Sequence, residues 1–355
     1  MLKELPLVSL FGTFIKESLN GKRRMPDGKR LKPQSVENYK YVLKYVMDYE
    51  LFSGKNLTIK INLPRNERII LKEKKYWKEF YRKFSDFLFL EKNCFDNYVG
   101  CVFKTLKCFF RYLKNEKYMV FPDFYENFYV PKEEIRIISL LPERFYFLIS
   151  NKEFENNLNY KLRRWKDVFV FGCTTALRFS DLMNLRVRDI ECIGQDHFLY
   201  YRSMKTDTPV NMKLPPFAVN IFLKYSISKR ATDKLFPSIS LLNFNKHIRS
   251  IAKQAKWVEV VGKFRSRNGK PIEIANGQHK LYKFCDLITS HVMRRTGITN
   301  LLMMGMPEYM VRKISGHSAQ SESFFRYVNF AQSYITEEID KVFEKLQKLY
   351  GSINC

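Results

Sequence analysis

Apolar residues recur at intervals of three and four through much of this sequence, which places them on one face of an α-helix. In the first third of the chain, this spacing predicts four helices, over 8–19, 34–52, 76–91 and 94–115. The pattern stays mostly helical to about residue 330. We therefore expect a mainly α protein with a small β-sheet, and 355 residues suffice for about two domains with their own cores.

The chain carries a large excess of positive charge. Its 62 lysines and arginines against 36 aspartates and glutamates give a formal net charge of +26. Such an excess calls for a polyanionic partner, with nucleic acid the first candidate and a membrane surface the alternative. Binding to phosphates releases counterions, so we expect the affinity to fall steeply with salt. No apolar run reaches about 18 residues, and the N-terminus lacks a small-residue cleavage site, so we expect a soluble protein that is not exported.

The seven cysteines include no CxxC pair. Cys94, Cys101 and Cys108 recur at heptad spacing in an apolar helical pattern, which predicts small buried residues on one helix face. An odd cysteine count without a disulfide framework is typical of a reducing cytoplasm. The five histidines show no zinc-like spacing with cysteines or acids, so we predict no metal site.

Two segments of the first half depart from the helical pattern. KRRMPDGKRLKP (22–33) surrounds a Pro-Asp-Gly turn signal with basic residues and suits a backbone of phosphates, with a solvated loop as the alternative. FPDFYENFYVPKEE (121–134) has prolines toward both ends and no clean period, which is typical of a connection between domains. We therefore expect domains at 1–140 and 141–355. The basic residues of the first segment are Lys22, Arg23, Arg24, Lys29, Arg30 and Lys32.

The second half mixes helices with hairpin patterns. The stretch 160–190 predicts two helices, and Arg178 and Asp181 lie three residues apart at the start of the second. The stretch 197–216 has two β-rich runs joined by Thr-Asp-Thr-Pro, which predicts a hairpin with Lys205 beside its turn. A later Gly- and Lys-rich stretch, GKFRSRNGKPIEIANGQHK, is interpreted as a loop or a second hairpin.

The stretch HVMRRTGIT brings a histidine and an arginine to the start of an apolar helix. His291 and Arg294 are three apart and so lie on the same face. Thr289 or Ser290 can cap the helix, which places the pair in its first turn. The positive end of the helix dipole and Arg294 together favour an anion, and a phosphate is the obvious candidate. The alternative is that both side chains only cap or solvate a helix end.

Six groups follow one another in the second half in an informative order: Arg178, Lys205, His291, Arg294, His317 and Tyr327. Their surroundings, TALRFSDL, MKTDTPV, HVMRRT, SGHS and FFRYV, closely resemble the motifs of the tyrosine recombinase (phage integrase) family. The resemblance covers nearly all of 140–330 and is most like integrases of mobile elements in Bacteroidetes-type bacteria. It implies a helical, SAM-like core-binding domain followed by a catalytic domain.

The resemblance implies DNA breakage and rejoining without metal or ATP. Tyr327 would attack a scissile phosphate and form a 3′-phosphotyrosyl link, for which a phenol with an ordinary pKa of about 10 needs a cationic site and a proton acceptor. Arg178 and Arg294 would neutralise the non-bridging oxygens. His291 would be the base or a donor to the phosphate.

Three further residues complete the implied site. Lys205 would protonate the leaving 5′ oxygen; Lys213 is its rival, but it lies farther from the turn. His317 would donate a hydrogen bond to the phosphate. Asp181 would not react itself but would fix Arg178 or His317.

The sequence departs from the family pattern in two places. Ala176 stands where the family usually has glycine, a mild change only if the backbone there does not need a positive φ. Tyr327 lies ten residues after His317, one more than the commonest family interval. Tyr334 and, more weakly, Tyr309 are therefore rival nucleophiles.

The resemblance implies four protomers around two specific DNA duplexes, in the bacterial cytoplasm with the nucleoid and away from membranes. The stretch TEEIDKVFEKLQKL (336–349) has apolar residues at helical spacing and must bury one face, on its own domain or on a neighbouring protomer. Two other functions stay open. One is a DNA-binding protein of this fold that does not cleave, and the other is a type IB-like topoisomerase that relaxes supercoils without pairing two sites.

Overall fold

A computed structural model of the chain describes residues 2–64, 66–204, 207–277, 281–318 and 320–351. The chain divides into two compact units, unit 1 with residues 1–135 and 264–274, and unit 2 with residues 136–263 and 275–355. The division therefore lies slightly before the expected boundary near residue 140. It also assigns to unit 1 a short segment, 264–274, that the sequence placed in the second domain.

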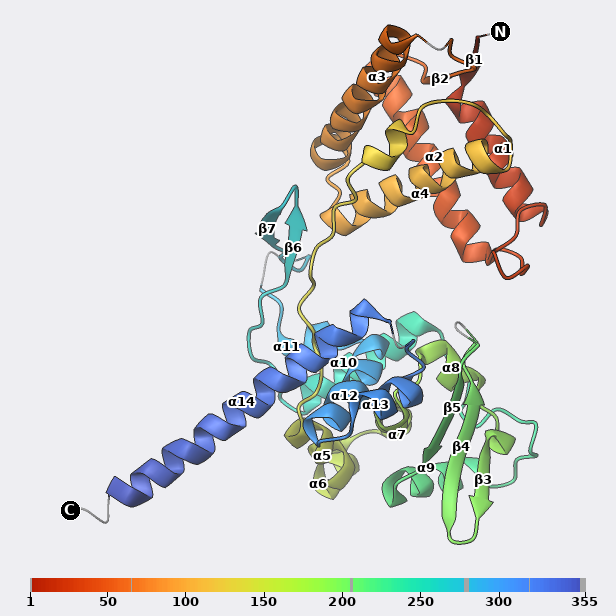
Figure 1. The fold of residues 1–355 in the computed structure, drawn as a ribbon. Helices are drawn as coiled ribbons and strands as arrows, with labels where there is room; N and C mark the ends of the chain where they lie inside the picture. Colours follow the sequence, from red (N-terminus) through yellow and green to blue (C-terminus); the bar gives the residue numbers. More distant parts are fainter. Residues whose placement is uncertain (1, 65, 205–206, 278–280, 319, 352–355) are drawn as a thin grey trace. The chain divides into compact units, whose positions relative to one another are not determined.

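In the described residues, unit 1 consists mainly of four long helices and a two-stranded sheet near the N-terminus, and it also includes a second two-stranded sheet within 264–274 (Figure 1). The helices are α1 (Leu7–Leu19), α2 (Pro33–Ser53), α3 (Glu67–Asp86) and α4 (Asp96–Asn115), and the antiparallel strands are β1 (Lys3–Pro6) and β2 (Thr58–Ile61). The predicted helices are confirmed, but α3 begins earlier than expected and continues into a π-helical turn, η1 (Phe87–Glu91). Its start is set by Asn66, whose side chain accepts a hydrogen bond from the Arg68 N–H at 3.0 Å.

The segment 121–134, expected to connect the domains, ends directly before the division between the units, and its aromatic residues also belong to the core of unit 1. It includes the 3-10 helix η2 (Phe124–Asn127). The Phe124 ring stacks on Trp77 with centroids 4.5 Å apart, and Phe128 is also buried. Burial of these aromatic rings explains why the segment is ordered without a helical or strand period.

The heptad cysteines do not share a buried face. Cys94 precedes α4 and is buried, Cys108 is half-buried, and Cys101 is exposed on α4. The prediction is therefore wrong for Cys101, because the buried face of α4 is formed by residues such as Val99, Val102 and Leu106, and Cys101 lies on the other side of the helix.

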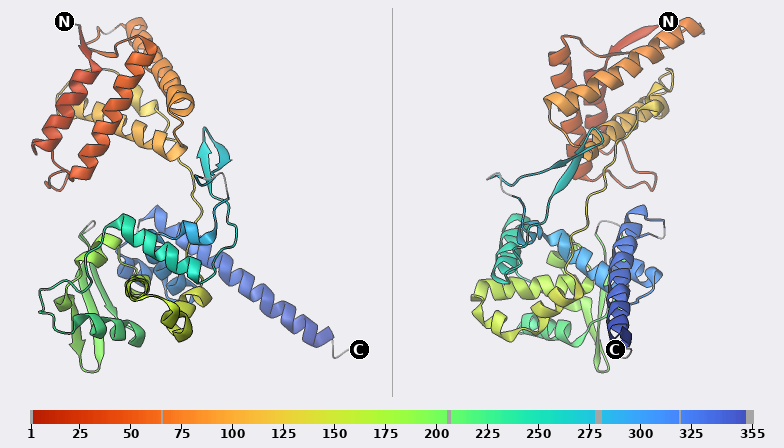
Figure 2. Two further views of the ribbon diagram at one scale, coloured as in Figure 1. Left: turned by 180° about the vertical axis from the view of Figure 1, so that it is seen from behind. Right: turned by 90° about the vertical axis from the view of Figure 1, so that its left-hand side faces the viewer.

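Unit 2 is helical, with one three-stranded antiparallel sheet at its side, which together with unit 1 confirms the mainly α fold with a small sheet (Figure 2). The sheet has the order β3 (Ile190–Ile193), β4 (Asp196–Arg202) and β5 (Pro209–Lys213). A short 3-10 helix, η3 (Val187–Asp189), precedes it. The helices are α5 (Pro142–Ser150), α6 (Lys152–Asn157), α7 (Tyr160–Thr175), α8 (Phe179–Asn184), α9 (Pro216–Ser226), α10 (Leu241–Gln254), α11 (Phe284–Leu287), α12 (Ser290–Met303), α13 (Glu308–Ser315) and α14 (Glu322–Gly351).

The two hairpins of the second half are present. In the first, β4 pairs with β5, as the sequence predicted, and the structure places Tyr201 opposite Val210. In the second, β6 (Phe264–Arg267) pairs with β7 (Lys270–Glu273), so the stretch interpreted as a loop or a hairpin is a hairpin. Its turn residues, Asn268 and Gly269, both have positive φ, at 51° and 73°, which matches the twist of a two-residue hairpin.

Helix α12 packs against α7, α13 and α14 and so connects the elements that carry the candidate site. The approach of α7 and α12 depends on Gly297. A Cβ atom at this position would lie 2.3 Å from the Cys173 carbonyl oxygen and 2.9 Å from the Ala176 Cβ. A side chain is therefore excluded where the two helices meet.

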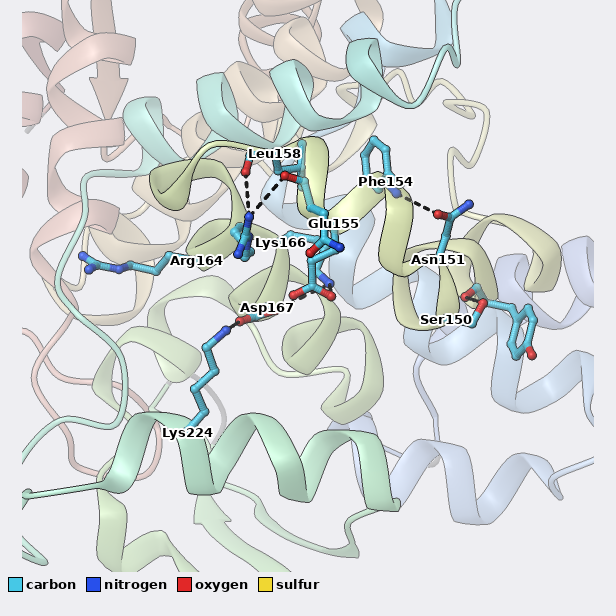
Figure 3. Close-up of polar contacts among 12 residues, drawn as sticks. Ser150, Asn151, Phe154, Glu155, Leu158, Arg164, Lys166, Asp167 and Lys224 are labelled. Atoms are coloured by element: carbon cyan, nitrogen blue, oxygen red, sulfur yellow. Dashed lines mark hydrogen bonds and ion pairs between the residues drawn. The ribbon is translucent and has the colours of Figure 1, made fainter.

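Two buried charged residues of α7 form ion pairs with more exposed partners on neighbouring helices (Figure 3). Lys166, which is 4% exposed, contacts Glu155 of α6 at 3.0 Å. Asp167, also 4% exposed, contacts Lys224 of α9 at 2.7 Å. Since each buried charge has a partner, α7 forms a fixed support for the residues at its C-terminal end. None of the helices in the described residues is both long and apolar enough to cross a membrane.

Candidate functional site

Arg294 lies at the centre of the candidate site, in the first turns of α12. Its side chain is buried, and it donates to the Ala176 carbonyl at 2.9 Å and to the Ser315 carbonyl at 2.5 Å. Burial, together with the charge of Arg178, lowers the pKa of Arg294 to about 10, so it stays charged at neutral pH. His291, one turn earlier, is exposed at the start of the same helix.

The cap of α12 differs in detail from the expectation. Thr289 occupies the cap position, but its side chain makes no capping hydrogen bond. The Ser290 N–H instead donates to the Asn245 side chain at 2.8 Å. An amide of α10 thus satisfies one of the free N–H groups at this helix end.

Ala176 ends α7 in a left-handed conformation, with φ at +52°. The backbone therefore does need a positive φ, so the exchange of the family's glycine for alanine is not mild. This conformation costs an L-residue roughly 1–2 kcal/mol. The strained residue also supplies the carbonyl that Arg294 uses.

Arg178 is held by a relay that ends on a buried carboxylate. Its Nη1 donates to Ser203 Oγ at 3.0 Å, and Ser203 Oγ donates to Asp181 Oδ2 at 3.1 Å. Asp181 is 1% exposed and also accepts from the Met204 N–H at 3.2 Å. Asp181 thus fixes Arg178 rather than His317, and acts through Ser203. Sequence reasoning missed Ser203, although a hydroxyl beside the predicted hairpin lysine was the available signal.

His317 follows Gly316, which ends α13 with φ at +62°. Its Nδ1 lies 2.8 Å from Ser315 Oγ and 3.4 Å from Arg294 Nη2. Nδ1 is therefore occupied inside the protein, which leaves Nε2 for an outside group. Burial lowers the pKa of His317 to about 3, and the charges of Arg294 and Arg178 act in the same direction. The imidazole is neutral at physiological pH.

Tyr327 lies on α14 against the same cluster. It is 8% exposed, and its ring centroid is 6.0 Å from that of His317 and 6.1 Å from that of Phe324. Arg294 and Arg295 both interact electrostatically with Tyr327. A phenol, two guanidinium groups and a neutral imidazole thus lie together in unit 2.

The rival tyrosines have different surroundings. The Tyr334 hydroxyl donates to Glu143 Oε1 at 2.8 Å. Burial and this carboxylate raise the pKa of Tyr334 to about 12, which opposes formation of a nucleophilic phenolate. Tyr309 is 70% exposed at the start of α13. Tyr334 is thus bonded to a carboxylate, whereas Tyr327 lies beside Arg294 and Arg295.

The hairpin lysine, Lys205, lies outside the described residues. Its rival Lys213 forms an ion pair with Asp196 at 2.6 Å, at the end of the hairpin away from the turn. Lys213 is thus engaged within the sheet. Ser203, which belongs to the relay to Arg178, directly follows the end of β4 and lies two residues before Lys205 in the sequence.

The basic segment 22–33 divides into one internal residue and several exposed ones. Arg23 is buried, contacts Glu116 at 3.1 Å, donates to Ser18 at 3.0 Å and covers the Phe14 ring. Its predicted role in contacting phosphates is therefore wrong, because the core of unit 1 satisfies its guanidinium. The exposed basic residues are Lys22, Arg24, Lys29, Arg30 and Lys32.

Chemically, the cluster suits a phosphate diester. The guanidinium groups of Arg178 and Arg294 offer charge-assisted donors, and His317 offers a neutral one. Within the described residues, no group of three or more histidines, cysteines or acids is placed to hold a metal ion.

Comparison with known proteins gives consistent matches. The sequence profile of the Phage integrase family matches residues 155–333. No curated protein gives a match. Among solved structures, that of the Tn1549 transposon integrase in complex with a circular intermediate DNA has a TM-score of 0.59 at 13% identity, covering 92% of this chain and 95% of that chain.

Two other solved structures are similar over most of their length. The λ integrase dimer bound to a COC′ core site has a TM-score of 0.55 at 15% identity, covering 92% of this chain and 77% of that chain. The XerH site-specific recombinase bound to difH substrate has a TM-score of 0.51 at 14% identity, covering 90% and 81%. At such low identity, these likenesses concern the fold alone.

Proposed function

Because the chain belongs to the phage integrase family, we propose that it is a site-specific DNA recombinase that works through a covalent phosphotyrosyl intermediate. The observation that carries the proposal is the convergence of Arg178, Arg294, His317 and Tyr327 in unit 2. These residues come from four separate stretches of sequence. Together they offer a nucleophile and the positive donors that stabilise the charge developing on a phosphate during phosphoryl transfer.

The two arginines bind the scissile phosphate. Arg294 is fixed by two backbone carbonyls and Arg178 by the relay through Ser203, so both reach the phosphate already oriented. Their charges stabilise the extra negative charge that develops on the non-bridging oxygens, and His317 adds a hydrogen bond from Nε2.

Tyr327 is the nucleophile. Its oxygen forms a bond to phosphorus as the bond to the 5′ oxygen breaks, which leaves a 3′-phosphotyrosyl link and a free 5′-hydroxyl. The tyrosine proton passes to His291 or to water, and Lys205 supplies the proton that the 5′ oxygen takes up. Attack by the 5′-hydroxyl of another strand reverses these steps, so rejoining consumes no ATP.

Assembly on DNA uses the far part of α14. In Figure 1 and in the left view of Figure 2, this part extends away from the rest of unit 2. It carries an exposed apolar stripe that includes Val342, Phe343 and Leu346. Unit 2 also has an apolar groove of about 650 Å³, lined among others by Phe145, Phe217 and Leu301. We assign the groove to the stripe of a neighbouring protomer, which supports a homotetramer around two duplexes.

Unit 1 and the exposed basic residues of 22–33 bind the DNA outside the scissile position. Lys22, Arg24, Lys29, Arg30 and Lys32 contact phosphates and position the enzyme without reading sequence. The specific sites belong to a mobile element of the Bacteroidetes type, and the reaction takes place at the bacterial nucleoid.

Strand exchange between two marked duplexes tests the proposal. The duplexes are taken from DNA that flanks the encoding gene, and EDTA is present without ATP. Joined products that need both duplexes support a recombinase. Relaxation of a supercoiled plasmid that lacks these sites would instead indicate a topoisomerase. Specific binding without any cleavage would indicate a DNA-binding protein.

A further inference from the structure

Arg312, on α13, is a buried charge that the proposed reaction does not use. Its side chain is 10% exposed. Its ion pair with Glu308 spans 3.6 Å, and the Glu308 side chain is 46% exposed. A pair with so exposed a partner contributes little to stability, whereas burial of a guanidinium is costly. A methionine would fill the same space at lower cost, so the charge calls for another explanation.

The contacts of Arg312 join three segments. Its guanidinium lies over the rings of Phe324 and Phe325 in the first turn of α14, with distances of 4.1 and 4.9 Å to their centroids. Its Nη1 reaches two carbonyls of the intervening loop, those of Ser318 at 3.3 Å and Ser321 at 3.5 Å. One side chain therefore links α13, the loop and α14.

The linked segments carry two residues of the candidate site. His317 opens the loop, and its backbone N–H donates to the Arg312 carbonyl at 2.9 Å. Phe324 is fully buried, and its ring lies 5.3 Å from that of His317 and 6.1 Å from that of Tyr327. A shift of Phe324 would therefore change the distance between the imidazole and the phenol.

We infer that Arg312 is a positioning residue, which holds Phe324 and the loop so that His317 and Tyr327 face the same phosphate. The inference rests on the proposed function, since it gives Tyr327 the role of nucleophile. The planar guanidinium matters because it stacks on a ring and donates to two carbonyls at once, which an ammonium group does less well. A misplacement of about 1 Å at a reacting group can lower a rate about 100-fold.

The test measures the rate of covalent adduct formation at saturating DNA, on a duplex from the flanking DNA, together with the dissociation constant for that duplex. Arg312→Lys keeps the charge, and Arg312→Met keeps the volume. We expect both variants to lower the rate about 10- to 100-fold while the dissociation constant stays within about twofold. Lys313→Met removes the same charge from the next, exposed residue and should leave the rate unchanged.

Two further readouts separate positioning from support of the fold. The urea midpoint of Arg312→Met should be high enough to leave the protein fully folded under the assay conditions, so that its lower rate reports on positioning and not on unfolding. Phe324→Leu should lower the rate as Arg312→Lys does, and the double variant should be no slower than either single one. A rate within about twofold of wild type in both Arg312 variants would overturn the inference, as would a lower rate matched by an equal loss of affinity. If wild type forms no adduct, the proposed function fails and the inference fails with it.

Discussion

Substitution of Gly297 by alanine tests the close approach of α7 and α12. The new Cβ would lie 2.3 Å from the Cys173 carbonyl oxygen, whereas carbon–oxygen contacts ordinarily begin at about 3.3 Å. The helices must therefore separate by roughly 1 Å, and overpacking of this kind costs about 1–3 kcal/mol. The change also displaces Ala176, whose carbonyl holds Arg294, so activity should fall together with stability.

Urea unfolding followed by circular dichroism measures this cost, and Gly12→Ala is the matched control. Gly12 also lies inside a helix, α1, but nothing lies within 4 Å of a Cβ built there. Alanine at this position should stabilise unit 1 by about 0.5–1 kcal/mol, since glycine weakens a helix interior. We therefore expect the free energy of unfolding to fall in Gly297→Ala and to rise in Gly12→Ala. A Gly297→Ala protein as stable as wild type would refute the described packing of α7 on α12.

Three other predictions concern the site and the basic segment. Asp181→Asn breaks the relay to Arg178 and should lower the rate of adduct formation about 10- to 100-fold. This corresponds to about 1.5–3 kcal/mol, the usual contribution of hydrogen bonds to a charged group. An unchanged rate would show that the relay does not contribute to the reaction. The pKa of His317 is lowered to about 3, so below about pH 6.5 only the unfolded chain takes up this proton. The free energy of unfolding of wild type should therefore fall by up to about 1.4 kcal/mol per pH unit as the pH is lowered between these two values. The urea midpoint of His317→Gln should depend less steeply on pH, and an equal dependence in both proteins would contradict the prediction. In the basic segment, Arg23→Ala should lower the urea midpoint of unit 1. Arg24→Ala should leave that midpoint unchanged and reduce the slope of log affinity against log salt by about 0.9, and the reverse pattern would contradict the division of the segment.

The sequence was sufficient for most of the secondary structure, because the apolar period follows directly from burial of one helix face. The long helices of unit 1 and the β4–β5 hairpin agree with their patterns. The burial of 121–134 in unit 1 was not predicted, because irregular backbone that is covered by aromatic rings shows no helical or strand period in the sequence. The assignment of 264–274 to unit 1 could not be predicted from the sequence either, because it depends on long-range contacts such as that of Arg265 with Glu133 at 2.6 Å.

For the candidate site, residue order indicated the cluster but not how its members are held. Arg178, Arg294, His317 and Tyr327 were named from their motifs, and the structure places them together. The signal for Ser203 was weak, because a serine beside a hairpin lysine is common and its role depends on a contact with Arg178 across 25 residues of sequence.

Arg23 shows the opposite error. Its charge and neighbours resembled those of the exposed residues around it, and its burial depends on contacts with the folded core, among them Glu116, 93 residues away, and the Phe14 ring. Pairings of this kind depend on tertiary structure, which local composition does not encode.

The most direct test of the central claim is identification of the tyrosine that becomes linked to DNA. The protein is incubated with a labelled duplex from the flanking DNA, the adduct that resists SDS is digested, and the peptide that carries the nucleotide is sequenced by mass spectrometry. Tyr327→Phe and Tyr334→Phe proteins are treated in parallel. We expect the nucleotide to be linked to Tyr327 and the adduct to be lost only in Tyr327→Phe. Modification of Tyr334, or an adduct that persists in Tyr327→Phe, would contradict this expectation.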